Sequence, residues 1–173
     1  MKLSCLLTSV VVAAALPVLS VRDRVDAQTP AYHPSADDLR AIEAKASDLS
    51  SRVSALRAKG ANAALIADVD IYEKAAEYIL RFPEEFVSQT FVADTRAVLD
   101  AGLTRARELD AGAPSWPTRT GHLVRGYVSR VDGSVQPYGL TIPASYDGRR
   151  PMRLDIWQHG TNRALNEVAF IRQ

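Results

Sequence analysis

Cysteine is almost absent from this sequence, and its absence limits how the folded chain can be stabilised. Cys5 is the single cysteine among 173 residues, and it lies inside an apolar stretch near the N-terminus. Once that stretch is removed, the mature chain can form no internal disulfide. Its stability must then come from a hydrophobic core, and the residues that remain are enough for one sizeable core or two modest ones.

An excess of charge of either sign is also missing. The 21 lysine and arginine residues offset 20 acidic residues, so the formal net charge is +1, and no block of basic residues occurs. Nucleic-acid binding through a basic surface requires clustered positive charge, so the composition argues against a nucleic-acid partner. Beyond the N-terminal stretch, no apolar run is long enough to predict a membrane span.

The usual ligand patterns for metals are missing as well. His33, His122 and His159 are the only histidines, and no His-x-x-x-His pair occurs. Because metal sites typically draw paired ligands from such short spacings, we expect no metal and no cofactor. Three aromatic residues are interpreted as core or interface groups rather than as a ligand-stacking surface: Tyr72, Tyr78 and Trp116.

The N-terminus has the pattern of a secretory signal peptide. Residues 3–21 are almost all apolar apart from a break at Pro17, and small residues just before Gln28 allow cleavage there. Cleavage after Ser20 is the competing possibility, and an uncleaved anchor helix is the alternative, because the stretch has about the 20 residues that a span needs. We interpret residues 1–27 as a cleaved leader. The sequence therefore predicts a secreted or periplasmic protein with no stable membrane span after cleavage.

Residues 35–111 are predicted to form a helical accessory domain, arranged as a helical hairpin or three-helix unit. The first helix should begin near Ser35, where Asp38 three residues later resembles a capping box, and it should end at Gly60. Asn62 is placed to cap the second helix. The other boundaries follow from stop signals: residues 82–83 end the second helix, and the third runs from about 88 to 111 before Gly112.

Each predicted helix carries one apolar stripe, with residues spaced by three and four positions. The stripes consist of Leu39, Ile42, Ala46, Leu49, Val53 and Leu56; of Leu65, Val69, Tyr72, Ala76 and Ile79; and of Val92, Leu99, Leu103 and Ala106. We expect the helices to bury these stripes against each other or against the rest of the chain. Partner binding or coiled-coil assembly is the alternative, but each stripe lasts three heptads or fewer.

After a linker rich in glycine and proline, the pattern changes to that of β-strands. Residues 122–131 and 135–142 alternate with a period near two, and Asp132-Gly133 between them predicts a two-residue hairpin in which both residues have positive φ. Pro137 lacks the backbone N–H that a ladder needs, so the second strand should lie at a sheet edge.

A third strand is predicted at residues 152–157 and a helix at residues 163–171, with His159-Gly160 in the connection between them. The predicted fold class is therefore α+β, a helical unit followed by antiparallel strands and one more helix. Gln173 falls within an apolar helix face, with no cap or polar tail, so we expect the sequence to be truncated.

An ordered set of motifs occupies the second half of the chain. Residues 132–140 read Asp-Gly-Ser-Val-Gln-Pro-Tyr-Gly-Leu, residues 142–146 read Ile-Pro-Ala-Ser-Tyr, and an apolar strand then leads into His159-Gly160. This set resembles the start of the α/β-hydrolase catalytic domain, most closely that of exported prolyl-oligopeptidase-like serine peptidases and related esterases. The resemblance implies that residues 121–173 open such a domain. The helical half matches no motif, although such peptidases often carry an extra N-terminal domain.

The resemblance implies acyl transfer on a peptide or ester substrate. In this family a serine on a strand-to-helix elbow attacks the carbonyl, a histidine takes its proton and an acid orients the histidine. The developing oxyanion receives N–H bonds, one of them from the loop that follows His-Gly, and losing one such bond costs roughly 3 kcal/mol. In this chain the matching oxyanion loop is His159, Gly160, Thr161 and Asn162. His159 would hold the loop, Gly160 would allow close approach, and Thr161 or Asn162 would donate the N–H.

Two departures from the family limit what this chain can do. Many relatives have Gly-Gly after the histidine, where this chain has Thr161-Asn162, so either N–H could be the one that reaches the substrate. No Gly-x-Ser-x-Gly occurs, and in the family order the serine, acid and base all come later, where only eleven residues remain. We therefore expect the N-terminal portion of an exported serine hydrolase, inactive by itself. The alternative is a complete, non-enzymatic exported module for binding or assembly, built of helices and a small antiparallel sheet.

Overall fold

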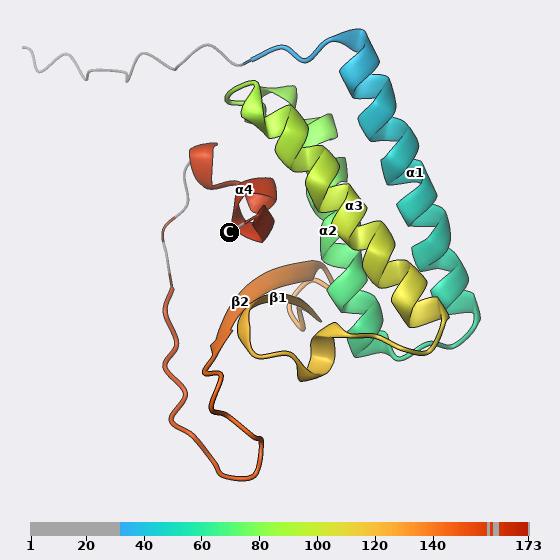
Figure 1. Cartoon of the computed structure of the whole chain (residues 1–173). Coiled ribbons are helices and arrows are strands. Elements are labelled where there is room, and N and C mark those ends of the chain that lie inside the picture. The colour runs from blue at the N-terminus through green and yellow to red at the C-terminus, as the bar shows by residue number, and fades with distance from the viewer. Residues whose placement is uncertain (1–31, 159, 161–162, 173) are drawn as a thin grey trace, which may run out of the picture.

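The computed structural model describes residues 32–158, 160 and 163–172, and the predicted leader at residues 1–27 lies outside them. In this part of the chain, three long helices precede a two-stranded antiparallel sheet and a short helix (Figure 1). The elements are α1 (Ala36–Ala58), α2 (Ala63–Arg81), η1 (Pro83–Glu85), α3 (Thr90–Asp110), η2 (Trp116–Thr118), β1 (Gly121–Val128), β2 (Val135–Ile142), η3 (Arg163–Leu165) and α4 (Glu167–Arg172), where η marks a 3-10 turn. The predicted α+β class is confirmed.

The first two helices begin at the predicted capping residues. Ser35 Oγ accepts the Asp38 N–H at 3.1 Å, and Asn62 Oδ1 accepts two N–H groups of the first turn of α2 at 2.9 and 3.3 Å. These bonds satisfy donors that the first turn of a helix cannot pair internally. Gly60 and Gly112 follow α1 and α3 with φ of +71° and +70°, a left-handed conformation that glycine adopts without strain.

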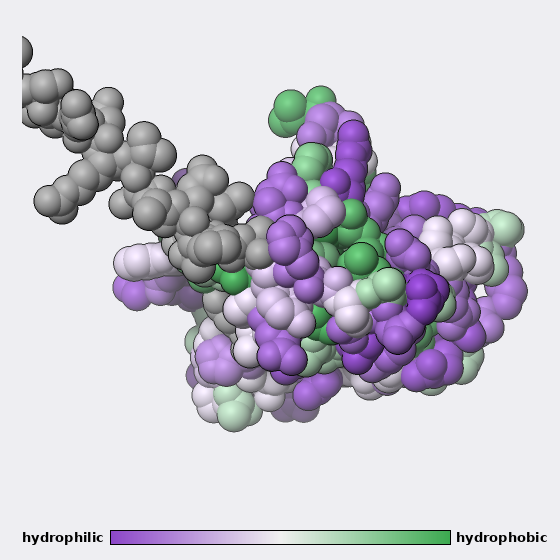
Figure 2. Space-filling model, turned by 90° about the horizontal axis from the view of Figure 1, so that it is seen from above, coloured by the Kyte–Doolittle hydropathy of each residue, from purple (hydrophilic) through white to green (hydrophobic). Residues whose placement is uncertain are grey.

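The apolar stripes of α1, α2 and α3 pack against one another, as expected for buried stripes. Trp116 and Phe86 are the largest fully buried side chains. The same cluster includes Val135 of β2 and Val168 of α4, so the three helices, the hairpin and α4 share one core. On the face shown in Figure 2, hydrophilic residues predominate and hydrophobic residues show between them toward the middle.

Gly102 of α3 lies where the three long helices approach closely. A Cβ added there would lie 2.7 Å from Leu49 Cδ2 of α1 and 2.7 Å from Tyr72 Cβ of α2. Alanine favours helix by about 1 kcal/mol over glycine, but the Cβ of Tyr72 is fixed to its backbone and cannot move aside as a side-chain tip would. We expect Gly102→Ala to lower the free energy of unfolding by about 1–2 kcal/mol in urea denaturation. Unchanged or higher stability would contradict this packing.

The two strands pair in register over all eight residues of each strand, but the predicted type of turn is wrong. The loop comprises residues 129–134, with the Ser129 N–H donating to Ser134 O at 2.8 Å and the Gly133 N–H to Ser129 O at 3.0 Å. Only Gly133 of the predicted pair has a positive φ, +73°. The Asp132 carboxylate instead accepts the Ser134 N–H at 3.2 Å, a local bond that competes with the two-residue hairpin. Asp132-Gly133 therefore predicted where the chain reverses but not the type of turn.

The predicted third strand at residues 152–157 is not formed in the described structure. Figure 1 shows this segment running apart from the hairpin, and the side chains of Leu154, Ile156 and Trp157 are 73%, 79% and 89% exposed. A stable strand needs backbone hydrogen bonds to a neighbouring strand and a surface against which one of its faces packs. The described residues provide this segment with neither. The prediction was wrong because alternation shows only that a segment could form a strand.

The predicted helix at residues 163–171 is divided into η3 and α4. Asn166 lies between them, and its Oδ1 accepts the Ala169 N–H at 3.1 Å, so it caps α4. Within the described residues, no helix has both the length and the apolar composition to cross a membrane.

Candidate functional site

Only Gly160 of the predicted oxyanion loop is placed by the structure. His159, Thr161 and Asn162 lie outside the described residues. Gly160 is exposed, and a Cβ added to it would meet no atom within 4 Å. The side-chain direction of Gly160 is therefore sterically open.

The helix that follows the predicted loop is anchored to the helical unit by polar and apolar contacts. Val168 of α4 is 1% exposed, and Lys74 of α2 forms an ion pair with Glu167 at 2.5 Å. Arg172 reaches Asp94 of α3 at 3.2 Å. These contacts fix α4, which follows the predicted loop in the sequence, against two helices that are far away in the sequence.

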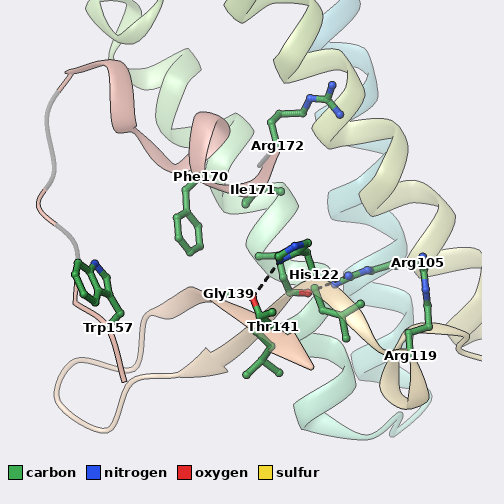
Figure 3. Close-up of a pocket in the computed structure, with 12 residues that line it drawn as sticks. Arg105, Arg119, His122, Gly139, Thr141, Trp157, Phe170, Ile171 and Arg172 are labelled. Atoms are coloured by element: carbon green, nitrogen blue, oxygen red, sulfur yellow. Dashed lines mark hydrogen bonds between the residues drawn. The ribbon is translucent and has the colours of Figure 1, made fainter. Parts of the chain in front are cut away.

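Two grooves flank the exposed segment before the loop. The first has a volume of about 600 Å³, and we call it the basic groove because Arg105, Arg119, His122 and Arg172 line it (Figure 3). The second has a volume of about 620 Å³, lies between β2 and residues 154–158, and is lined mostly by apolar side chains. Both volumes are within the range of small-molecule sites.

His122 and Thr141 form a cross-strand pair in the basic groove. The His122 Nδ1 lies 3.1 Å from the Thr141 Oγ1, and both residues are exposed (Figure 3). In the part of the chain that the structure describes, no carboxylate is hydrogen-bonded to His122. The pair therefore lacks the acid that orients the base in a catalytic triad.

Asp68 of α2 is fully buried and joins the helical unit to β1. Its Oδ2 accepts from Trp116 Nε1 at 2.9 Å and from Arg125 Nε at 2.7 Å, and its Oδ1 accepts the Gly126 N–H at 2.7 Å. The hydrogen bond to Asp68 raises the pKa of the Arg125 guanidinium above its ordinary value. Because both carboxylate oxygens are satisfied, this junction is a structural connection.

Arg105 of α3 is held by carbonyl and aromatic groups. Its guanidinium donates to the backbone oxygens of Asp68 at 3.0 Å and Val124 at 2.9 Å, and its central carbon lies 5.0 and 5.1 Å from the ring centres of Tyr72 and Trp116. Burial lowers the pKa of Arg105 below its ordinary value. Carbonyl oxygens and aromatic faces stabilise a cation without cancelling its charge, so positive potential remains at this wall of the basic groove.

Sequence reasoning missed the Asp68 junction, although one signal for it was present. Asp68 lies four residues before Tyr72 and next to Val69, within the predicted apolar stripe of α2. A charged residue on a buried helix face must find buried partners. The partners themselves, Arg125 and Gly126, could not be read from spacing, because they lie in a strand far away in the sequence.

Within residues 32–158, 160 and 163–172, no three or more His, Cys, Asp or Glu side chains are grouped so that they could hold a metal ion. Comparison of the chain with protein-family models, with curated proteins and with solved structures gave no match. Any functional interpretation therefore depends on the sequence motifs and on the geometry of the loop and the two grooves.

Proposed function

We propose that residues 1–173 form the N-terminal part of an exported serine hydrolase, a peptidase or esterase. Residues 159–162 would contribute a backbone N–H to the oxyanion hole, and the serine, acid and histidine base would lie in polypeptide that follows residue 173. Residues 1–27 would direct export, and the three long helices would form an accessory unit in front of the catalytic domain.

The observation that carries the proposal is the exposed, strand-like segment that leads to Gly160. Leu154, Ile156 and Trp157 expose most of their surface within four positions of the sequence. Clustered large apolar side chains on a surface usually mark a face that another element covers. β2 also has a backbone edge unpaired by the described residues. Further strands that pair with this edge and cover the segment would build the larger sheet that the resemblance implies.

The contribution of this chain to acyl transfer would be electrostatic. As the serine oxygen attacks the carbonyl carbon, negative charge moves onto the carbonyl oxygen, and a backbone N–H of the loop donates to it. Such a donor is effective when it is already in place before the reaction, because no reorganisation is then needed. The ion pairs of Glu167 and Arg172 support this role, because they hold α4, which follows the predicted loop in the sequence, against α2 and α3.

The proposal is tested by the coding sequence that follows the Gln173 codon. An open reading frame that continues and encodes Gly-x-Ser-x-Gly, then an acid and a histidine, supports it. A stop codon directly after Gln173 in independent clones contradicts it.

We expect residues 1–173 alone to have no esterase activity. The folded chain should hydrolyse p-nitrophenyl acetate no faster than an equal concentration of the chain unfolded in urea, once the effect of urea on the background hydrolysis rate is subtracted. The reason is that His122 has no orienting carboxylate among the described residues, and the family nucleophile motif is absent. The measurement is the release of p-nitrophenol at neutral pH. A burst of product equal in amount to the chain would contradict the placement of the nucleophile beyond residue 173.

The shared core supports a second candidate function, a non-enzymatic exported binding or assembly module. Val135 and Val168 belong to the same apolar cluster as the three helices, which is how a self-contained folding unit is built. The stop codon that contradicts the hydrolase proposal would favour this module.

A further inference from the structure

We propose that the basic groove binds an anionic amphiphile, a molecule with one carboxylate headgroup and an apolar chain. This inference does not rest on the hydrolase proposal and requires none of the residues that acyl transfer would use as nucleophile, acid or base. It needs Trp157 to line an open groove, so at this residue it is an alternative to the covering strands of that proposal. The charge, the shape and the apolar lining of the groove favour such a ligand.

The charged residues that line the groove are all arginines. Three arginines and one histidine line it, and no aspartate or glutamate is among the described lining residues. Arg172 is compensated by its ion pair with Asp94. Arg105 and Arg119 are not compensated in this way, so the groove has an excess of positive charge.

Arg119 is the residue best placed to meet a ligand. It is exposed. Its backbone N–H donates to the Trp116 O at 3.3 Å, but its guanidinium forms no hydrogen bond or ion pair with another described residue. Glu108 interacts electrostatically with it but forms no ion pair with it, and Glu108 already accepts the Ser115 N–H at 2.9 Å and the Ser115 hydroxyl at 2.7 Å. A guanidinium with its donors available can bind both oxygens of a carboxylate, which favours an oxyanion over a neutral group.

The apolar lining gives the groove a second, distinct region. Figure 3 shows Arg105 and Arg119 on one side of the groove and Trp157 and Phe170 on the other, with His122 between them. Leu123 and Leu140 also line the groove. An extended hydrocarbon chain lying toward the aromatic side would bury apolar surface while its headgroup stays near Arg119. This arrangement fits an amphiphile better than a small inorganic anion.

Decanoate is a suitable probe for the full chain, used below the concentration at which it forms micelles. We expect saturable binding by calorimetry and a blue shift of the fluorescence from the exposed Trp157, while Trp116 is already buried. Two molecules serve as comparisons: 1-decanol, which has the chain without the charge, and acetate, which has the charge without the long chain. Each should bind at least about tenfold more weakly than decanoate. Added salt should weaken decanoate binding, because the headgroup interaction is electrostatic.

Arg119→Ala should weaken decanoate binding by about tenfold, and Arg119→Glu should abolish it. Arg130→Ala is the matched control, since it removes the same charge from an exposed arginine at the opposite end of the hairpin and should leave binding unchanged. Circular dichroism would verify that each variant is folded. Equal binding of decanol and decanoate, equal binding by the Arg119 and Arg130 variants, or a dimer of the chain that excludes decanoate from the groove would overturn the proposal.

Discussion

Asp68→Ala is expected to lower the free energy of unfolding by about 3 kcal/mol. The carboxylate of Asp68 is fully buried and accepts from Trp116, Arg125 and Gly126, at 2.9, 2.7 and 2.7 Å. Removing it leaves an indole N–H, a backbone N–H and a largely buried guanidinium without their acceptor. A buried donor without an acceptor has lost its hydrogen bonds to water and has no bond in the protein to replace them. Removing the acceptor therefore lowers stability by more than the intact hydrogen bonds contribute to it.

Urea denaturation followed by circular dichroism measures this effect, with Asp100→Ala as the control. Asp100 pairs with Lys45 at 2.5 Å, but its side chain is 58% exposed, so its removal should change stability by less than about 1 kcal/mol. Asp68→Asn keeps one carbonyl acceptor, so its free energy of unfolding should fall by only about 1–2 kcal/mol. This variant allows the measurement to be made even if the alanine variant does not fold. Similar losses for Asp68→Ala and Asp100→Ala would show that the junction contributes little.

Gly126→Ala should be about as damaging, with an expected loss of about 3 kcal/mol. A Cβ at this position would lie 2.1 Å from the carbonyl oxygen of Ala67 and 2.6 Å from its carbonyl carbon. These are backbone atoms of α2 and cannot rotate away, so either the helix or the strand must shift. A shift would also lengthen the 2.7 Å hydrogen bond from the Gly126 N–H to Asp68.

Gly139→Ala provides a matched control within the same sheet. The nearest atom to its added Cβ is Phe170 Cζ at 3.7 Å, an ordinary van der Waals contact. Because glycine in a strand interior loses more backbone entropy on folding than alanine does, this variant should be neutral or more stable by up to about 1 kcal/mol. Equal stability of the Gly126 and Gly139 variants in urea would refute the close approach of β1 to α2.

The helices could be predicted well because their determinants are local. Ser35 and Asn62 cap α1 and α2 through bonds to residues two or three positions later, and the apolar stripes repeat within each helix. The position of the chain reversal near Gly133 was predictable for the same reason. Its geometry was not, because the carboxylate of Asp132 offers the loop a competing hydrogen bond.

The predicted oxyanion loop shows where sequence patterns stop being informative. The motif order placed Gly160 after a strand, and the structure places it, exposed, after an extended segment that has no strand partner among the described residues. Whether an alternating segment becomes a strand depends on a neighbour, and residues 152–157 do not encode that neighbour.

By itself, the sequence determined the positions of the helices, the hairpin and the apolar stripes, because each of these follows from interactions between residues a few positions apart. Only the tertiary structure decided that Asp68 would meet Arg125 and Gly126, and that Arg105, Arg119 and His122 would line one groove. These contacts join residues from separate helices and strands. The contacts depend on how helices and strands pack in three dimensions, and the spacing of residues along the sequence does not predict that packing.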